Sequence, residues 1–156
     1  MPVLLLVVMA IWWFVFRPIA QEQGWVEVTS SFAICGELGP REEGCVVDGD
    51  TVVLGFGGER RRIRLIGFDA PEIDGRCEAE RELAIAARTR LHRWLSEGSF
   101  EWNGADDPPR DQYGRELRRV RRASDDGDFE YLGETMIAAG FASESGYGAD
   151  PVDWCE

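Results

Sequence analysis

Lysine is absent from this 156-residue chain, and histidine occurs once, as His92. All 17 basic residues are therefore arginines, and 29 acidic residues bring the net charge to −12. Affinity for nucleic acid comes largely from neutralising phosphates, so this balance argues against tight, non-specific nucleic-acid binding. A zinc site is also disfavoured, because the chain has no Cys-x-x-Cys pair and only one imidazole. A chain of this length supports one modest hydrophobic core.

The arginines are unevenly spread along the chain. Nine of the 17 fall in two runs: Arg60, Arg61, Arg62 and Arg64, then Arg115, Arg118, Arg119, Arg121 and Arg122. Two interpretations stay open. In the first, the arginines lie on a solvated strand face and pair with Glu59, Glu116 and the acidic residues 125–128. In the second, they form a basic surface on an otherwise acidic molecule.

The first 20 residues differ from the rest in composition. Residues 2–16 contain no charged side chain. A helix of that length reaches about 23 Å, against roughly 30 Å for a bilayer core, and spans it only if Arg17 snorkels and residues 18–20 are included. Residues 1–20 are therefore predicted to be a transmembrane signal-anchor or a signal peptide, with 2–20 contacting the membrane. The lack of preceding basic side chains and of a good cleavage site favours the uncleaved anchor over a signal peptide, and a buried helix of the domain is least favoured.

Four cysteines favour an oxidising compartment. Of the three possible connectivities we expect Cys35 with Cys45, across a turn-rich stretch, and Cys77 with Cys155, which ties down the C-terminal tail. Closing the longer loop contributes roughly 4 kcal/mol in the chain-entropy model. Reduced, buried cysteines remain the alternative if the domain faces the cytoplasm.

Hydrophobic periodicity predicts a strand-rich α+β domain. Residues 24–34 alternate weakly and indicate an added strand or arm, after a linker at 21–24. Further strands are expected at 46–47, 51–56, 60–66, 100–102 and 115–120, and helices at 78–97 and 131–139.

Separated polar motifs together supply the groups that phosphodiester cleavage requires. They are Asp48-Gly49-Asp50-Thr51, Arg64, Asp69-Ala70-Pro71-Glu72 and Asp111-Gln112-Tyr113-Gly114-Arg115. Two carboxylates are hard ligands for a metal ion, a third is suited to handling a water proton, and guanidinium groups bind phosphate. Each motif alone is an ordinary turn or strand end. Their combination predicts a phosphoryl-transfer site.

The order and context of these motifs resemble the staphylococcal nuclease (thermonuclease) family, from about Cys45 to Ala142. The matching segments are 46–52, 62–72, 113–115 and 139–142. The resemblance implies that Asp50 and Asp69 ligate Ca²⁺ together with the backbone carbonyl of Ala70, a position where the family often has threonine. It also implies that Glu72 acts on the attacking water and that Arg64 and Arg115 hold the phosphate. We expect Tyr113 to contact the substrate.

The family's fold is an OB-fold, a five-stranded barrel, which the resemblance places at residues 45–156. Residues 21–44 are then a linker and added strand, behind the hydrophobic membrane helix. The expected function is calcium-dependent hydrolysis of DNA or RNA outside the cytoplasm, with the domain membrane-anchored and facing the periplasm or exterior, or secreted if the N-terminus is cleaved. Nucleic acid is the expected substrate and no protein partner is expected. The alternatives are a non-catalytic nuclease-fold binding module in the cell envelope and an envelope protein whose acidic surface meets a protein.

Overall fold

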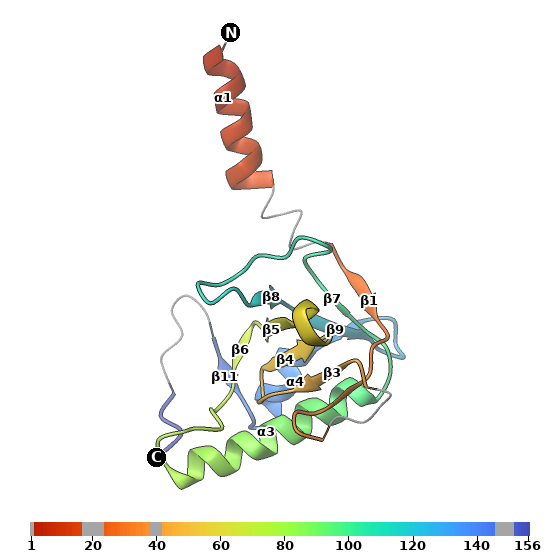
Figure 1. Cartoon of the computed structure of the whole chain (residues 1–156), viewed down its shortest axis with the longest axis vertical. Coiled ribbons are helices and arrows are strands. Elements are labelled where there is room, and N and C mark those ends of the chain that lie inside the picture. The colour runs from red at the N-terminus through yellow and green to blue at the C-terminus, as the bar shows by residue number, and fades with distance from the viewer. Residues whose placement is uncertain (1, 17–23, 38–41, 146–151) are drawn as a thin grey trace.

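The protein has an α+β fold in which short strands form open sheets and a long helix crosses beside them (Figure 1). A computed structural model describes residues 2–16, 24–37, 42–145 and 152–156. The α+β class expected from the sequence is confirmed. Part of the predicted linker at 21–24, and residues 17–20 of the predicted membrane segment, lie outside the described residues.

The N-terminal apolar stretch is helical, as α1 (Pro2–Ile11) followed by a π-helical turn, η1 (Trp12–Phe16). Its large hydrophobic side chains from Leu4 to Phe16 are exposed. The sequence left open that this segment is a buried helix of the domain, and its exposed side chains show that this alternative is wrong. Among the described residues, no helix combines the length and apolar character needed to cross a membrane. The membrane span over 2–20 stays a prediction.

The largest sheet has the strand order β2-β3-β4-β5-β8. Its strands are β2 (Phe32–Ile34), β3 (Gly44–Val46), β4 (Thr51–Leu54), β5 (Arg61–Leu65) and β8 (Glu116–Arg118). In β5 the buried Ile63 and Leu65 alternate with arginines, which is the pattern of a strand with one face in the core. Thr51 lies opposite Arg64 in the antiparallel β4–β5 ladder, so the sheet itself brings the Asp50 turn beside Arg64.

A second sheet has the order β1-β7-β9-β10, and a short ladder joins β11 to β6. Their strands are β1 (Val26–Val28), β7 (Phe100–Trp102), β9 (Val120–Ala123), β10 (Phe129–Tyr131), β6 (Phe68–Asp69) and β11 (Ser143–Glu144). The predicted arm at 24–34 is two strands, which pair with β7 and β3. The sheets of the described residues are open and close no barrel, so the five-stranded OB barrel stays a prediction.

The predicted single strand at 115–120 is wrong, because the chain changes sheets within it. β8 pairs with β5, whereas β9 pairs with β7 and β10. Arg119 lies at the crossing, where the Asn103 backbone N–H donates to its carbonyl. A run of apolar and arginine residues reads as one strand in the sequence because periodicity does not record which neighbour a strand pairs with.

Two helices complete the domain. α3 (Glu78–Ser96) buries a stripe of side chains that includes Ala84, Ala87, Leu91 and Trp94. α4 (Leu132–Ala138) buries Leu132 and Met136, and a short 3₁₀ turn, η2 (Gly57–Glu59), links β4 to β5. Both α-helices agree with the sequence prediction to within about two residues. Fully burying each large apolar side chain of this core contributes about 1.5–3 kcal/mol.

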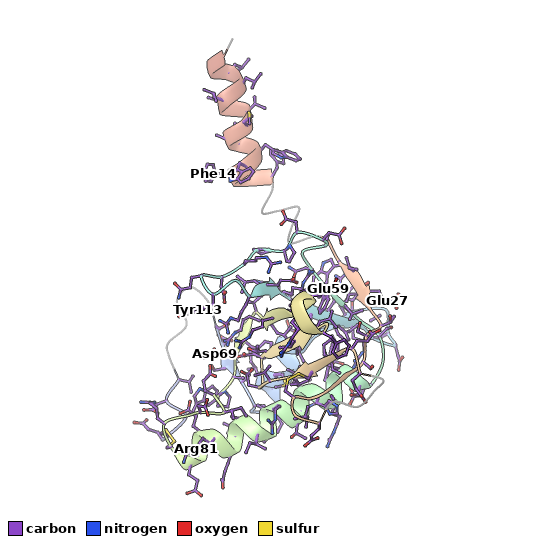
Figure 2. The ribbon with its side chains drawn as sticks, in the orientation of Figure 1. Phe14, Glu27, Glu59, Asp69, Arg81 and Tyr113 are labelled. Carbon is purple, nitrogen blue, oxygen red and sulfur yellow. A yellow bond between two sulfur atoms is a disulfide. The ribbon has the colours of Figure 1, made fainter. Side chains whose placement is uncertain are left out.

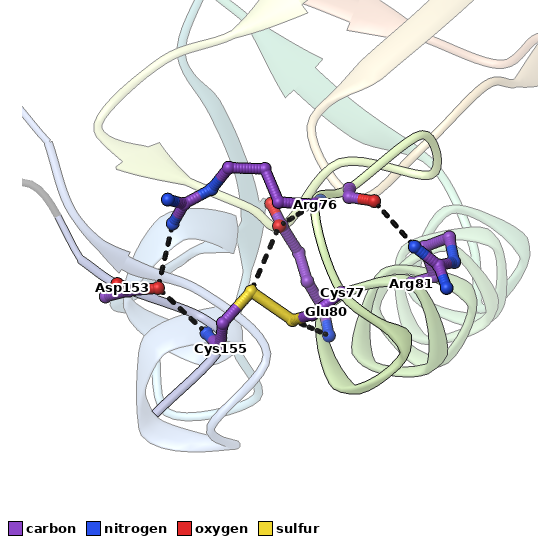
Figure 3. Close-up of a disulfide and its surroundings, with 7 residues drawn as sticks. Arg76, Cys77, Glu80, Arg81, Asp153 and Cys155 are labelled. Carbon is purple, nitrogen blue, oxygen red and sulfur yellow. Dashed lines mark hydrogen bonds and ion pairs between the residues drawn. A yellow bond between two sulfur atoms is a disulfide. The ribbon is translucent and has the colours of Figure 1, made fainter.

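Both predicted disulfides are present, Cys35–Cys45 and Cys77–Cys155. Cys77 is also the N-cap of α3, where its sulfur accepts a hydrogen bond from the Glu80 backbone N–H. Figure 3 shows this bridge beside an ion pair between Arg76 and Asp153, which ties the tail to the loop before α3 a second time. The described C-terminal tail is thus fastened next to the segment that carries Glu72.

Candidate active site

The turn between β3 and β4 positions the first acidic motif. A Cβ at Gly49 would lie 2.6 Å from the Ala70 Cβ and 2.8 Å from the Ala87 Cβ, closer than real contacts allow. Only glycine therefore lets this turn pack against both α3 and the strand end that follows Asp69. The Asp48 carboxylate accepts a hydrogen bond from the Asp50 backbone N–H, which fixes the turn internally. The predicted turn chemistry is present, and it serves to bring two acidic segments together.

Asp50 is the most buried acidic group of the site, with 1% of its surface exposed. Its carboxylate accepts hydrogen bonds from the Thr51 hydroxyl and from the Ala70 backbone N–H, both at 3.0 Å. Burial raises the pKa of Asp50 to about 8, although the Arg64 charge opposes that shift. A buried carboxylate of this kind favours either a proton or a nearby cation.

Arg64 joins the two carboxylates that were predicted as metal ligands. Its Nη1 lies 2.8 Å from Asp50 Oδ1, and its Nη2 donates to Asp69 Oδ1. Burial lowers the pKa of Arg64, but the charges of Asp50 and Asp69 outweigh burial and raise it. The side chain of Asp69 is about half exposed, so this pair opens towards solvent (Figure 2).

Glu72 lies close enough to these groups to share their electrostatic field. Partial burial of its carboxylate and the charge of Asp48 raise the pKa of Glu72, while Arg64 and Arg115 lower it and Asp69 raises it further. The charges of Arg64, Arg115 and Asp69 thus all act on the Glu72 carboxylate. A raised pKa moves a carboxylate towards the range in which it accepts protons near neutral pH.

Arg115 and Tyr113 belong to a tight loop that precedes β8. The Asp111 carboxylate accepts hydrogen bonds from the backbone N–H groups of Tyr113 and Arg115, and from Arg115 Nε at 2.7 Å. Desolvation works against ionisation of Asp111, but these bonds outweigh it and lower its pKa. Gly114 adopts a φ of 78°, which a glycine adopts without strain.

The outer groups of this loop face solvent. Tyr113 is 75% exposed, and Figure 2 shows it at the edge of the domain. Arg115 lies over that ring, with its Cζ 5.6 Å from the ring centroid. Asp111 occupies the Nε edge of Arg115, and among the described residues neither Nη atom has a hydrogen-bond acceptor. The loop thus presents one guanidinium edge and one aromatic ring to a ligand.

Most arginines of the two runs form ion pairs with carboxylates of the protein. Six of the nine arginines form ion pairs, which join Arg61 and Arg118 to Glu116, Arg64 to Asp50 and Asp69, Arg115 to Asp111, Arg121 to Glu101, and Arg122 to Glu97. Of the partners expected from the sequence only Glu116 is right, because Glu59 and residues 125–128 make none of these pairs. Arg60, Arg62 and Arg119 are exposed and make no ion pair within the described ranges. A basic surface is therefore restricted to these three residues and the site arginines.

The acidic groups of the site fit a hard cation by chemistry, but they do not form a closed cage. Within the described part of the chain, the one set of three candidate ligand atoms within 4.8 Å of one another comprises Cys77, Glu80 and Cys155. Both sulfurs of that set are bonded to each other, so neither is available as a thiolate. Asp50 and Asp69 instead offer an open pair of oxygen ligands that Arg64 bridges. The role of the Ala70 carbonyl as a ligand stays a prediction.

Sequence reasoning missed the buried support behind Arg115. Glu116 and Arg118 are each 2% exposed and form an ion pair of 2.9 Å, and Arg61 binds the same carboxylate. The alternating pattern of residues 115–120 could have indicated this support, because it places charged side chains at inward positions, where each requires a partner. Arg61 lies 55 residues from Glu116 in the sequence, so local spacing could not identify it as the partner.

In comparisons with known proteins, no protein-family model matches the chain and no curated protein matches it. The likeness to the staphylococcal nuclease family therefore stays a prediction from the quoted motifs.

Proposed function

We propose that the protein is a calcium-dependent phosphodiesterase that hydrolyses DNA or RNA outside the cytoplasm. One observation carries the proposal: the Arg64 guanidinium bridges Asp50 and Asp69 while Glu72 and Arg115 share the same electrostatic field. Asp50, Arg64 and Asp69, from three separate segments, are joined by direct ion pairs, and the charges of Arg64, Asp69 and Arg115 act on Glu72. Ordinary turn and capping interactions do not require that convergence.

Asp50 and Asp69, with the Ala70 carbonyl, are the residues that would hold Ca²⁺. The fit rests on a carboxylate that is almost fully buried and stabilised as an anion only by Arg64 and two hydrogen bonds. All three donors are oxygens, which suits Ca²⁺. When bound, the ion would supply positive charge to the nonbridging oxygens of the phosphate.

The protein side chains divide the remaining chemistry among them. Glu72 takes a proton from water as the water oxygen bonds to phosphorus, and the leaving oxygen separates as its bond to phosphorus breaks. Arg64 and Arg115 stabilise the charge that builds up on the five-coordinate phosphorus. Tyr113 stacks against a base or sugar beside Arg115. The exposed ring and the open Nη edge of Arg115 support this arrangement.

The proposal also covers the fold class of the domain and its cellular compartment. We place residues 45–156 in the OB-fold class, with β3, β4, β5 and β8 of the open five-stranded sheet as part of an incomplete barrel. The two disulfides support an oxidising compartment. A membrane-anchored domain that faces the periplasm or exterior accounts for these disulfides together with the exposed apolar N-terminal helix.

The second candidate is a non-catalytic nuclease-fold module that binds nucleic acid or another envelope component. The neutralisation of six of the nine clustered arginines favours a protein partner over nucleic acid as the ligand of such a module, because few cations remain for tight phosphate binding. The two functions differ in product. Full-length protein is incubated with linear DNA and with RNA, in Ca²⁺ or in a chelator, beside the Glu72→Gln variant and the exposed helix control Glu82→Gln. Calcium-dependent shortening of the substrate that Glu72→Gln abolishes and Glu82→Gln retains supports the enzyme, whereas binding without cleavage supports the module.

A further inference from the structure

Glu116 gathers three arginines around one buried carboxylate. Arg61 donates to both of its oxygens at 2.8 and 3.0 Å, Arg118 donates at 2.9 Å, and Arg110 donates at 3.3 Å. Burial raises the pKa of Glu116, but the hydrogen bonds from Arg61 and Arg118 outweigh burial and lower it. The carboxylate is therefore a fixed, charged anchor immediately after Arg115 in the chain.

Arg110 connects this anchor to the loop that carries Arg115. Its Nη2 contacts Glu116 Oε1, while its Nη1 donates to the Gly114 carbonyl at 3.0 Å. Arg110 also forms an isolated antiparallel bridge with Glu116, and the Leu117 backbone N–H donates to the Pro109 carbonyl. One planar guanidinium thus holds the last peptide before Arg115 at a set distance from the buried anchor.

We propose that Arg110 is a positioning residue for Arg115, acting through the Gly114 carbonyl and the Glu116 carboxylate. The inference rests on the proposed function for its effect on turnover, and on the structure alone for its effect on the loop. Arg115 Nε donates to Asp111, which lies in the same loop, so this bond alone does not fix the position of the pair relative to the core. The Arg110 side chain provides a further link from that loop to the core, beside the backbone contacts of residues 109 and 110 with residues 116 and 117.

Arg61 offers a matched control for Arg110. Both side chains are about half exposed, both bind Glu116 Oε1, and both substitutions remove one positive charge from the same carboxylate. Arg61 binds Glu116 through two bonds from β5 and is not bonded to the 111–115 loop. Arg61→Met therefore removes at least as much support from Glu116 as Arg110→Met does, while it leaves the Gly114 contact in place.

The test compares Arg110→Met, Arg61→Met and wild-type full-length protein by amide hydrogen exchange and by calcium-dependent cleavage. In wild type, the Gly114 and Arg115 N–H groups donate to Asp111. We expect both amides to exchange faster in Arg110→Met and at the wild-type rate in Arg61→Met. Because a misplacement of about 1 Å lowers turnover by up to about 100-fold, kcat should fall roughly 10- to 100-fold in Arg110→Met, with little change in KM. Arg61→Met should lower kcat less than Arg110→Met does, even if its unfolding midpoint falls further.

Wild-type exchange at Gly114 and Arg115 in Arg110→Met would overturn the inference. Equal losses of kcat in the two variants would also overturn it, since they would mark a general effect of charge or stability. If wild-type protein cleaves neither DNA nor RNA, the proposed function fails, and the exchange measurement still decides whether Arg110 holds the loop.

Discussion

Arg64 Nη1 lies 2.8 Å from Asp50 Oδ1, in a pair that joins a partly buried guanidinium to a buried carboxylate. The same guanidinium donates to Asp69, so one side-chain cation stands between the two acidic groups proposed to hold Ca²⁺. A guanidinium and a divalent ion compete for the same carboxylate oxygens. Because Arg64 contacts the proposed metal ligands and is also the proposed phosphate contact, a change in one of these sites should alter the other electrostatically.

Replacing Arg64 with alanine is expected to separate these two roles. Removal of a positive charge a few ångströms from both carboxylates should tighten Ca²⁺ binding about tenfold or more. Turnover should fall by about 100-fold or more, since the phosphate loses a contact that strengthens in the transition state. Titration calorimetry with Ca²⁺ checks the first effect, and Arg62→Ala on the exposed face of β5 is the control. Weaker Ca²⁺ binding in Arg64→Ala would show that the guanidinium organises the carboxylates instead of competing for them.

Asp50 predicts an unusual pH dependence for the calcium-free protein. Its pKa rises from an ordinary 3.8 to about 8 on folding, so its contribution to stability is fully present below pH 3.8 and is lost as the pH rises towards 8. Asp50→Asn should flatten that part of the curve, and it should stabilise the calcium-free protein more at pH 8 than at pH 5, relative to wild type. Urea unfolding in chelator at pH 5 and pH 8 measures both effects. The exposed Asp106→Asn variant should keep the wild-type pH dependence, and an equal pH dependence in Asp50→Asn would contradict the assignment.

Gly49 should tolerate no side chain. A methyl group there meets the Cβ atoms of Ala70 and Ala87, so Gly49→Ala should destabilise the fold by roughly 1–3 kcal/mol and move Asp50 away from Ala70. Gly58→Ala is the matched control, because a Cβ at Gly58 meets no atom within 4 Å. Thermal unfolding and Ca²⁺ titration of the two variants check the prediction. Wild-type behaviour of Gly49→Ala would mean that the turn packs more loosely than the structure describes.

The Cys77–Cys155 disulfide should contribute more stability than its counterpart does. It closes a loop of 78 residues, against 10 for Cys35–Cys45, and loop-closure entropy grows slowly with length. Replacing both Cys77 and Cys155 with serine should lower the free energy of unfolding by roughly 4 kcal/mol. Unreduced wild-type protein should react with no maleimide, and labelling of all four cysteines would reject both bridges.

Features that depend on residues close together in the sequence were predicted well. The α3 stripe, the β5 alternation and the Asp48-Gly49 turn each follow from neighbouring residues. The tail disulfide was chosen among three connectivities because it holds the C-terminal tail. The arginine pairings were less accessible, since Arg61 finds Glu116 across 55 residues and Arg121 finds Glu101 across 20. The change of sheet at Arg119 was missed for the same reason, because strand pairing is a property of the assembled domain. Within the site, residue types were predictable and the bridge from Arg64 to both carboxylates was not.

The most direct test of the proposed function follows cleavage and Ca²⁺ binding in the same Glu72→Gln protein. Wild-type full-length protein should shorten DNA or RNA only when Ca²⁺ is present. Glu72→Gln should bind Ca²⁺ as wild type does and cleave about 10²- to 10⁴-fold more slowly, because only the proton acceptor for the attacking water has been lost. Absence of cleavage by wild-type protein at saturating Ca²⁺, or an unchanged rate in Glu72→Gln, would contradict the proposed phosphodiesterase.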